Sequence, residues 1–124
     1  MSPIMTEDRR TTAHYIVSEA HGYRSREQVM IAAGSGKLLA GTVLGRVTAT
    51  KKFVAFDPAA TDGSQNAAAV LYESCDATAA DVRRTISARD TEIQGAVLVW
   101  KSGVNDSQKT AALASLAALG LIAR

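Results

Sequence analysis

Two histidines near the start of the chain are the residues with the clearest potential for metal chemistry. His14 and His21 lie seven positions apart with Glu19 between them, and imidazole and carboxylate groups are common zinc ligands. A metal site also needs neighbouring groups that fix the orientation of each ligand. The polar sequence around these residues has no pattern that would provide such groups. We therefore interpret both histidines as solvated surface residues and expect no metal site.

A glycine-rich run over Gly34–Lys37 (GSGK) resembles part of a phosphate-binding loop. A complete loop of this kind has a glycine five positions before its Gly-Lys pair and a serine or threonine after it. Ile31 and Leu38 occupy those two positions. The dinucleotide-binding fingerprint fails as well, because Leu39 stands where its third glycine is required. The run is therefore interpreted as a hairpin turn, and no nucleotide or other cofactor is expected.

Four aspartates could provide acid–base chemistry: Asp57, Asp62, Asp76 and Asp81. Each lies in a turn-like context, and aspartate is frequent in turns because its side chain hydrogen-bonds the nearby backbone. The chain lacks a Gly-X-Ser-X-Gly motif, and after His21 it contains no histidine that could act as a general base. A hydrolase would need a nucleophile and a base of this kind. We expect no catalytic residues and no enzymatic activity.

The composition is that of a single globular domain. The chain has 124 residues, of which 47% are hydrophobic and 21% charged, and this length is sufficient for a buried core. The formal net charge is only +2 and the basic residues are scattered, whereas nucleic-acid-binding domains usually carry a basic stripe. Cys75 is the only cysteine, which excludes an internal disulfide. We expect it to be a small buried side chain.

The chain has no sequence signal for a membrane. No apolar run approaches the roughly 20 residues that a membrane-spanning helix needs. The first ten residues lack the apolar segment of a secretory signal. We therefore expect a soluble protein made in the cytoplasm, with no membrane partner and no direct nucleic-acid partner.

The elements that would position these residues are centred on a stretch from Gly45 to Tyr72. Lys52–Phe56 has aromatic residues at alternate positions, which is typical of a strand. Thr61–Ser64 consists of turn residues, including a glycine that readily adopts a positive φ. Ala67–Tyr72 then resumes as an apolar strand. We interpret the stretch as the core hairpin of a β-rich domain.

Further strands are predicted on both sides of this stretch. Glycines break the apolar segment Leu38–Gly45, which favours sharp bends or bulges. Ser74–Asp81 is predicted to be a loop, whereas Val82–Ala88 fits either a strand or a helix. The other predicted strands are His14–Glu19, Glu27–Ala33, Arg46–Thr50, Ile93–Trp100 and Leu121–Ala123.

One helix is predicted near the C-terminus. Asn105 or Asp106 is a suitable N-cap, and Gln108 follows Asn105 by three residues, as in a capping box. Lys109–Leu119 is rich in alanine and leucine, which favour helix. Gly120 is typical of the position just after a helix C-terminus.

The N-terminal part of the chain is predicted to be a flexible arm. Residues 1 to about 13 are polar, charged and unpatterned, a composition that does not favour a packed core. The strand around Tyr15–Val17 has no other predicted strand close to it in the sequence. Such a strand would pair either with an edge of the chain's own sheet or with the sheet of another protein.

The order of these segments resembles the lambda-type head decoration protein D family of tailed bacteriophages and prophages. Phe56 departs from the family pattern, in which tryptophan is usual at this position, and Lys101 stands where a proline commonly follows the tryptophan. The stretches that carry the resemblance are Ile16–Ala20 with Ser25–Glu27, Ala40–Gly45, Lys52–Asp57 with Thr61–Gly63 and Ala69–Leu71, and Leu98–Trp100 leading into Asp106–Lys109.

The resemblance implies a mainly β (α+β) fold, a compact β-clip-like domain with a C-terminal helix. It implies a flexible capsid-binding arm over residues 1–26 and a β-rich decoration domain over residues 27–124. It further implies a homotrimer that binds the major capsid protein at threefold and quasi-threefold points on the outer surface of the expanded head. There it would stabilise the shell against the pressure of the packaged DNA.

Two sets of contact residues are predicted on this basis. The arm would bind the capsid through Tyr15, Ile16, Val17, Ser18, Tyr23, Ser25 and Arg26. The trimer interface would involve Phe53, Phe56, Asp57, Asp62 and Trp100. The alternative is a small ligand- or carbohydrate-binding β module on a virion surface. That module would have a concave pocket lined by aromatic residues, which make up only 5% of this chain.

Overall fold

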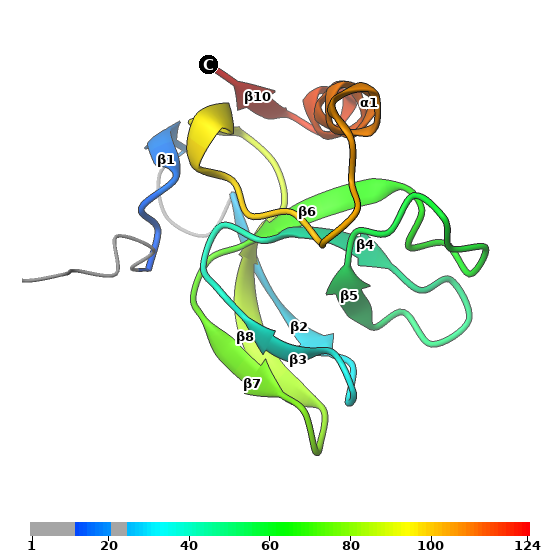
Figure 1. Ribbon diagram of the computed structural model, residues 1–124. Coiled ribbons are helices and arrows are strands. Elements are labelled where there is room, and N and C mark those ends of the chain that lie inside the picture. The colour runs from blue at the N-terminus through cyan, green and yellow to red at the C-terminus, as the bar shows by residue number, and fades with distance from the viewer. Residues whose placement is uncertain (1–11, 21–24) are drawn as a thin grey trace, which may run out of the picture.

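The computed structural model describes residues 12–20 and 25–124, which form a mainly β fold with one long helix (Figure 1). The predicted fold class and C-terminal helix are therefore confirmed, and the β-clip description stays a prediction. The helices are the 3-10 helix η1 (Gly95–Val97) and α1 (Asp106–Ala118). The strands are β1 (Ile16–Glu19), β2 (Arg26–Ile31), β3 (Gly36–Leu38), β4 (Val43–Arg46), β5 (Phe53–Ala55), β6 (Ala67–Leu71), β7 (Cys75–Ala77), β8 (Val82–Ser87), β9 (Thr91–Ile93) and β10 (Leu121–Ala123).

Five strands close into a small barrel in the order β2-β5-β4-β6-β8. Most neighbours are antiparallel: β4 pairs with β5 and β6, and β8 pairs with β2 and β6. Fully buried aliphatic side chains from these strands, including Ile31, Leu44, Leu71 and Ile86, belong to one hydrophobic cluster. Removing such side chains from water is the main favourable contribution to folding.

The barrel closes through a single pairing between β2 and β5. The two strands are parallel and pair only where Ile31 lies opposite Phe53. Beside this pair, the backbone nitrogen of Ala32 donates to the carbonyl oxygen of Phe53 at 3.0 Å. On its other side, β2 pairs with β8 along its whole length. One edge of β2 is therefore fully paired, and the other is paired at its C-terminal end alone.

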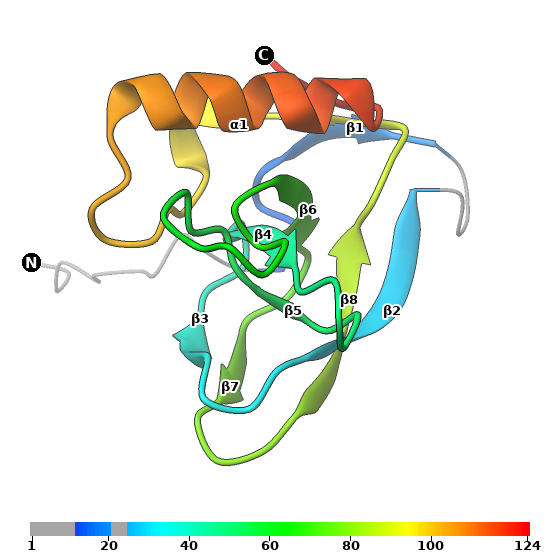
Figure 2. The same ribbon diagram turned by 90° about the vertical axis from the view of Figure 1, so that its right-hand side faces the viewer.

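A three-stranded sheet and the helix lie together at one end of the barrel (Figures 1 and 2). The sheet has the order β1-β9-β10, with β1 antiparallel and β10 parallel to β9. Tyr15, Ile93, Leu116 and Leu121 are fully buried in a second hydrophobic cluster, which also includes residues of β4 and β6. This cluster joins the sheet and α1 to the barrel.

The predicted ends of α1 are confirmed. Asn105 is the N-cap of a capping box, in which the Gln108 nitrogen donates to the Asn105 side chain and the Asn105 nitrogen donates to the Gln108 side chain, both at 2.9 Å. Gly120 follows the helix with a φ of +92°, a left-handed conformation that glycine adopts without steric cost. This turn directs the chain into the predicted closing strand, β10.

The predicted core hairpin is wrong, because β4 lies between β5 and β6 and pairs with both. The loop that joins β5 to β6 packs back onto β4 instead. A Cβ atom at Gly45 would lie 2.3 Å from the carbonyl oxygen of Ser64, so only glycine permits this close approach. The pairing of β4 with β6 shifts register between Leu44 and Gly45, which is the bulge expected where glycine interrupts an apolar strand.

Other local predictions also need correction. Ser74–Asp81 contains β7 rather than a continuous loop, and Cys75 is buried there, as expected. Within Gly34–Lys37, Gly34 lies in a turn, whereas Gly36 and Lys37 begin β3. The run is not a hairpin turn, because β3 pairs with β7 and not with β2. Arg46–Thr50 leaves the strand after its first residue and turns. Ile93–Trp100 divides into the end of β9, η1 and a short bridge.

The ambiguity over Val82–Ala88 is resolved in favour of a strand, because β8 covers all but its last residue. β8 lies between β2 and β6 in the barrel. Its pairing partners, rather than its own weakly alternating sequence, therefore determine its conformation.

Candidate functional site

The described residues that precede β2, residues 12–20 and Ser25, pack onto the domain body. Tyr15 is fully buried, and its phenolic oxygen lies 2.5 Å from the side-chain oxygen of Ser87 on β8. Burial raises the pKa of Tyr15 well above its ordinary value. The His14 ring packs edge-on against Tyr15, with 5.8 Å between the ring centroids. Tyr15 is thus a core anchor, and its side chain has no surface to offer a partner in this conformation.

β1 follows this anchor as the outer strand of its sheet. Its register on β9 shifts between Ile16 and Ser18, and the residue between them, Val17, is 55% exposed. Ser18 is also exposed, and its hydroxyl donates to Glu92 at 2.9 Å. Within the described residues, the edge of β1 that faces away from β9 has no strand partner. β1 therefore presents both an unpaired backbone edge and an exposed apolar side chain.

Glu19, at the end of β1, forms a polar clip with the start of β2. Its carboxylate accepts a hydrogen bond from Ser25 at 2.9 Å and forms an ion pair with Arg26. The Arg26 guanidinium also lies over the Tyr72 ring, 4.3 Å from its centroid. Partial burial alone would raise the pKa of Glu19, but the hydrogen bonds from Arg26 and Ser25 outweigh it and hold the pKa below its ordinary value. The clip fixes β1 to the barrel.

The predicted capsid-contact residues therefore fall into three groups. Tyr15 and Ser25 are fully buried, and Arg26 is engaged by Glu19 and Tyr72. Ile16, Val17 and Ser18 keep accessible surface on β1. Tyr23 lies outside the described residues, as do His21 and residues 1–11 of the predicted arm.

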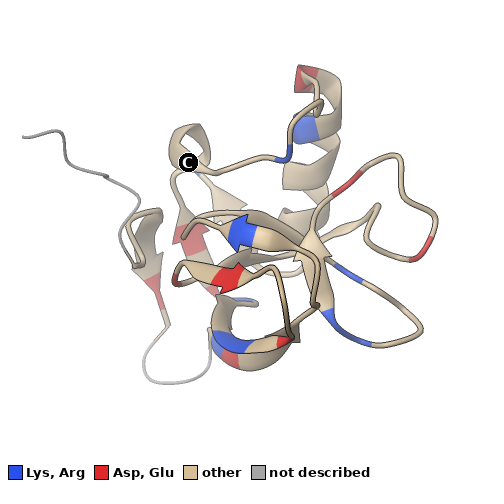
Figure 3. Ribbon diagram, turned by 60° about the horizontal axis from the view of Figure 1, so that its bottom comes forward, with Lys and Arg blue, Asp and Glu red and all other residues tan. Residues whose placement is uncertain are grey.

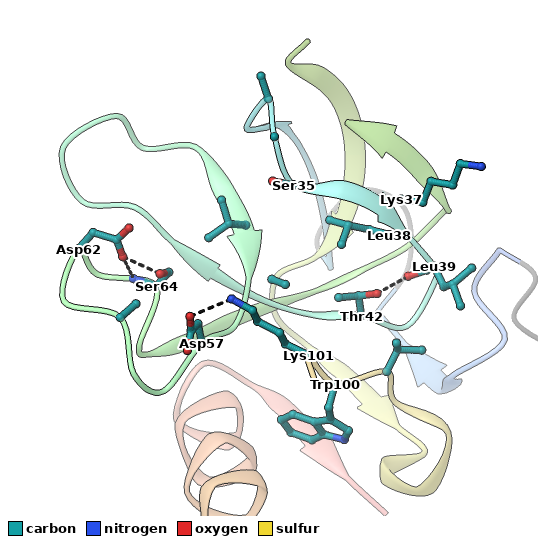
Figure 4. A pocket seen from close by; sticks show the side chains of 16 residues that line it. Ser35, Lys37, Leu38, Leu39, Thr42, Asp57, Asp62, Ser64, Trp100 and Lys101 are labelled. Carbon is teal, nitrogen blue, oxygen red and sulfur yellow. Dashed lines mark hydrogen bonds and ion pairs between the residues drawn. The ribbon is translucent and has the colours of Figure 1, made fainter. Parts of the chain in front are cut away.

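The second set of predicted residues lies around one groove, of about 570 Å³, between the β3 region and the turn after β5 (Figure 4). Asp57, Asp62 and Trp100 line it. Phe53 and Phe56 are buried beneath the surface, with exposed fractions of 7% and 4%. The structure thus brings three of the five predicted residues to one surface and makes the other two part of the core.

The two walls of the groove differ in character. In Figure 4, Leu38, Leu39 and Thr42 lie on one side, and Asp57, Asp62 and Ser64 lie on the other. Leu39 is 38% exposed although it is apolar, and no periodicity in the sequence identified it. Leu39 therefore adds accessible apolar surface to a groove whose other wall carries aspartates.

Lys101 spans the groove and pairs with one of its aspartates (Figure 4). Its amino group donates to Asp57 at 2.9 Å. This bond and a second one from the Ala59 backbone nitrogen hold the pKa of Asp57 below its ordinary value. Lys101 is one of the two residues noted above as departures from the expected family pattern, and its ion pair with Asp57 explains how a cation is accommodated there.

Asp62 is held by its own turn. It accepts hydrogen bonds from the hydroxyl and backbone nitrogen of Ser64, at 2.5 Å and 3.0 Å. These bonds lower its pKa. Both groove aspartates are therefore ionised and committed to local structure at neutral pH, which suits a fixed charged surface better than proton transfer.

Trp100 links the groove to the helix. Its ring meets the Phe56 ring edge-on, with 6.1 Å between centroids, and the Lys109 amino group lies 6.0 Å from its centroid. Among residues 12–20 and 25–124, it is the only aromatic residue that lines the groove. A carbohydrate site commonly stacks a sugar between aromatic faces, so this lining favours a protein contact over the ligand-binding alternative.

The described residues contain neither a cluster of metal ligands nor a helix that could span a membrane. Within residues 12–20 and 25–124, no group of three or more His, Cys, Asp and Glu side chains could hold a metal ion. The same residues contain no helix that is long and apolar enough to cross a membrane. Asp76, considered above as a possible acid, accepts a hydrogen bond from the Thr78 hydroxyl. Asp81, the other such candidate, forms an ion pair with Lys52 and accepts a hydrogen bond from the Ala33 backbone nitrogen.

Comparison with known proteins gives one family. A family model described as bacteriophage lambda head decoration protein D matches residues 4–121 of the 124-residue chain. No curated protein matches the chain.

Proposed function

Since the chain belongs to the bacteriophage lambda head decoration protein D family, we propose that it is the structural cement of a phage head. Membership makes it a phage capsid decoration protein and a virion component. We propose that it binds as a homotrimer at threefold and quasi-threefold sites on the outer surface of the expanded shell, after synthesis in the host cytoplasm. Its partner there is the major capsid protein, and its role is to hold the shell against DNA pressure. The family match over residues 4–121 is the observation that carries this proposal.

β1 supports a specific mode of attachment. Its outer edge has no strand partner among the described residues, and Val17 is exposed beside that edge. A capsid strand that adds to this edge would gain main-chain hydrogen bonds, and Val17 would contribute apolar contact. Because Tyr15 and the Glu19 clip hold β1 in place, the strand is already ordered before binding. The entropic cost of ordering it is therefore not paid on the capsid.

A trimer would strengthen a weak contact of this kind. Three β1 edges on one rigid particle bind together, so each additional contact forms at a high effective concentration. A trimer on a threefold site also presents the same surface to three equivalent capsid positions. We place the subunit contacts at the groove lined by Leu39, Asp57, Asp62 and Trp100, because it combines apolar surface with fixed charge.

Co-sedimentation with expanded capsids that lack decoration tests the proposal. Deletion of residues 1–26 would remove Tyr15 from the core, so loss of binding by that variant would not separate contact from folding. Val17→Asp instead places a charge on the exposed surface of β1. Ala79→Asp adds the same charge in an exposed turn after β7, at the opposite end of the domain.

We expect the wild type and Ala79→Asp to sediment with capsids, and Val17→Asp to remain largely in the supernatant. Failure of the wild-type protein to bind would contradict the proposed function. Equal binding by all three proteins would contradict the role of β1 and leave the decoration function standing.

A further inference from the structure

A basic hollow opens beside β2, at the place where the barrel is held together by only one residue pair. β2 pairs with β5 only at Ile31 and Phe53, and the strands separate from there. The hollow measures about 510 Å³, and it is lined by β2, the hairpin of β4 and β5, and Arg83 of β8. It lies apart from the groove around Trp100, with which it shares no lining residue.

The backbone of β2 is directed into this hollow. Ala32 donates its backbone N–H to Phe53, which shows that its N–H points away from β8. Alternate residues of a strand direct their backbone groups to the same edge. Gln28 and Met30 therefore present their backbone groups to the edge that faces away from β8. Among residues 12–20 and 25–124, no strand pairs with β2 at these two positions on that edge.

The rim of the hollow carries positive charge that no acidic side chain in the described part of the protein neutralises. Arg46, Lys51 and Arg83 line it and form no ion pair there. Lys52 and Glu27 also line it, but each is already paired, with Asp81 and Arg89 respectively. In Figure 3 the loop from β4 to β5 is basic, while the neighbouring loop from β5 to β6 is acidic.

An exposed apolar side chain completes the surface. Met30 is 39% exposed and lies opposite Arg83 in the β2–β8 pairing. Met30 and Arg83 therefore share one face of the ladder, because side chains opposite each other in an antiparallel pair point to the same face. An unpaired strand edge, three uncompensated cations and an apolar contact define the chemistry of a matching partner.

We propose that this edge of β2 is a docking site for an extended acidic peptide segment of another protein, which adds to the sheet as a strand. Gln28 and Met30 supply backbone hydrogen bonds, and Arg46, Lys51 and Arg83 pair with carboxylates at alternate positions of the peptide. Main-chain pairing supplies affinity in such strand addition, and the side-chain contacts supply specificity. The site is separate from the β1 edge, and it does not depend on the decoration function.

The test uses the full-length protein and a fluorescein-labelled peptide that alternates glutamate and valine, with binding followed by fluorescence anisotropy. A peptide that alternates lysine and valine and a thymidine oligonucleotide serve as competing probes. We expect saturable binding of the acidic peptide that weakens as salt rises, because charge pairs near a surface are screened. Absence of binding, or tighter binding of either competing probe, would overturn the proposal.

Charge variants test the cationic rim. The double variant Lys51→Asn/Arg83→Gln removes two charges, and asparagine suits the positive φ of 60° at residue 51. We expect it to bind the acidic peptide about tenfold more weakly, since two charged contacts of about 0.7 kcal/mol each sum to that factor. Lys37→Gln/Lys109→Gln removes two charges elsewhere and should bind like the wild type. Equal weakening by both double variants would refute a specific site.

A proline variant tests the strand edge itself. Gln28→Pro removes the N–H that faces the hollow and leaves the bonds of β2 to β8, a position where strands tolerate proline. We expect it to lose peptide binding while Gln28→Ala retains it. If both variants bind normally, the peptide does not add to β2 and the proposal fails. If Gln28→Pro does not fold, as judged by circular dichroism, the charge variants still decide the outcome.

Discussion

The phenolic oxygen of Tyr15 lies 2.5 Å from the side-chain oxygen of Ser87, and both residues are fully buried. The two are 72 positions apart in sequence. Their contact joins the residue that directly precedes β1 to the barrel strand β8. β1 therefore belongs to the folded body.

Substitution of Tyr15 tests this anchor. Tyr15→Phe leaves the buried Ser87 hydroxyl without its partner and should lower the free energy of unfolding by about 1–3 kcal/mol. Tyr15→Ala also opens a cavity and should cost about 3–5 kcal/mol. Urea denaturation measures both. Tyr72→Phe, at a half-buried position whose hydroxyl makes no hydrogen bond to a described residue, should change stability by less than about 0.5 kcal/mol. An unaltered midpoint for Tyr15→Ala would contradict the anchor.

The Glu19 clip should make the free energy of unfolding depend on pH in the acidic range. Its pKa lies below the ordinary 4.5 in the folded state, so the unfolded chain binds more protons at acidic pH. The clip therefore stabilises the fold above about pH 4.5, and this contribution is lost as pH falls through the folded pKa.

Glu19→Gln should accordingly be less stable than the wild type at neutral pH, and the two should converge as the pH falls below 4.5 and through the lowered pKa of Glu19. Denaturation midpoints across this range measure the effect. Glu73→Gln is the control, because Glu73 forms no ion pair in the described part of the chain. A constant difference between Glu19→Gln and wild type at every pH would show that the carboxylate charge is not responsible.

Gly45 should be the glycine least tolerant of a side chain among strand positions. An alanine Cβ there would meet the Ser64 backbone at 2.3 Å, so the β5–β6 loop would have to move. We expect Gly45→Ala to cost about 3 kcal/mol or more. Gly95→Ala is the matched control, since its nearest contact is an ordinary 3.6 Å. Thermal unfolding distinguishes them, and similar melting temperatures for the two variants would contradict the close packing.

The local features of the fold were predictable from sequence where short-range chemistry determines them. The capping residues Asn105 and Gln108 and the terminal Gly120 define α1 through contacts within a few residues. The long-range pairings were not predictable in this way. β4 lies between β5 and β6, and the β5–β6 loop packs on it where Gly45 lets Ser64 approach. No periodicity in the sequence encodes that contact.

The residues of the candidate site were also predictable only in part, because some depend on contacts between distant parts of the sequence. Asp57, Asp62 and Trp100 were predicted together and line one groove. Tyr15 was predicted to contact the capsid because the family resemblance implies a capsid-binding arm and the strand around this residue has no other predicted strand close in sequence, whereas the structure buries its side chain. Its partner, Ser87, is a small polar residue of a strand far along the chain. Lys51 and Arg83 form one basic rim only because the closed barrel places β2 between β8 and β5 of the β4–β5 hairpin.

Leu39 offers a test of the proposed subunit contact. It lines the groove and is 38% exposed, so Leu39→Asp should fold normally but associate more weakly, because it would bury a charge against a neighbour. Sedimentation equilibrium should show the wild type as a trimer and Leu39→Asp shifted toward monomer, with Ala79→Asp like the wild type. If Leu39→Asp remains fully trimeric, the subunit interface does not include this groove.

The most direct test of the cement function is the temperature at which expanded, DNA-filled heads that lack decoration release their DNA, with and without this protein. The account predicts that saturating wild-type protein raises this temperature, that Ala79→Asp does the same, and that Val17→Asp has little effect. Release at the same temperature with and without wild-type protein bound to the heads would contradict a role in stabilising the capsid.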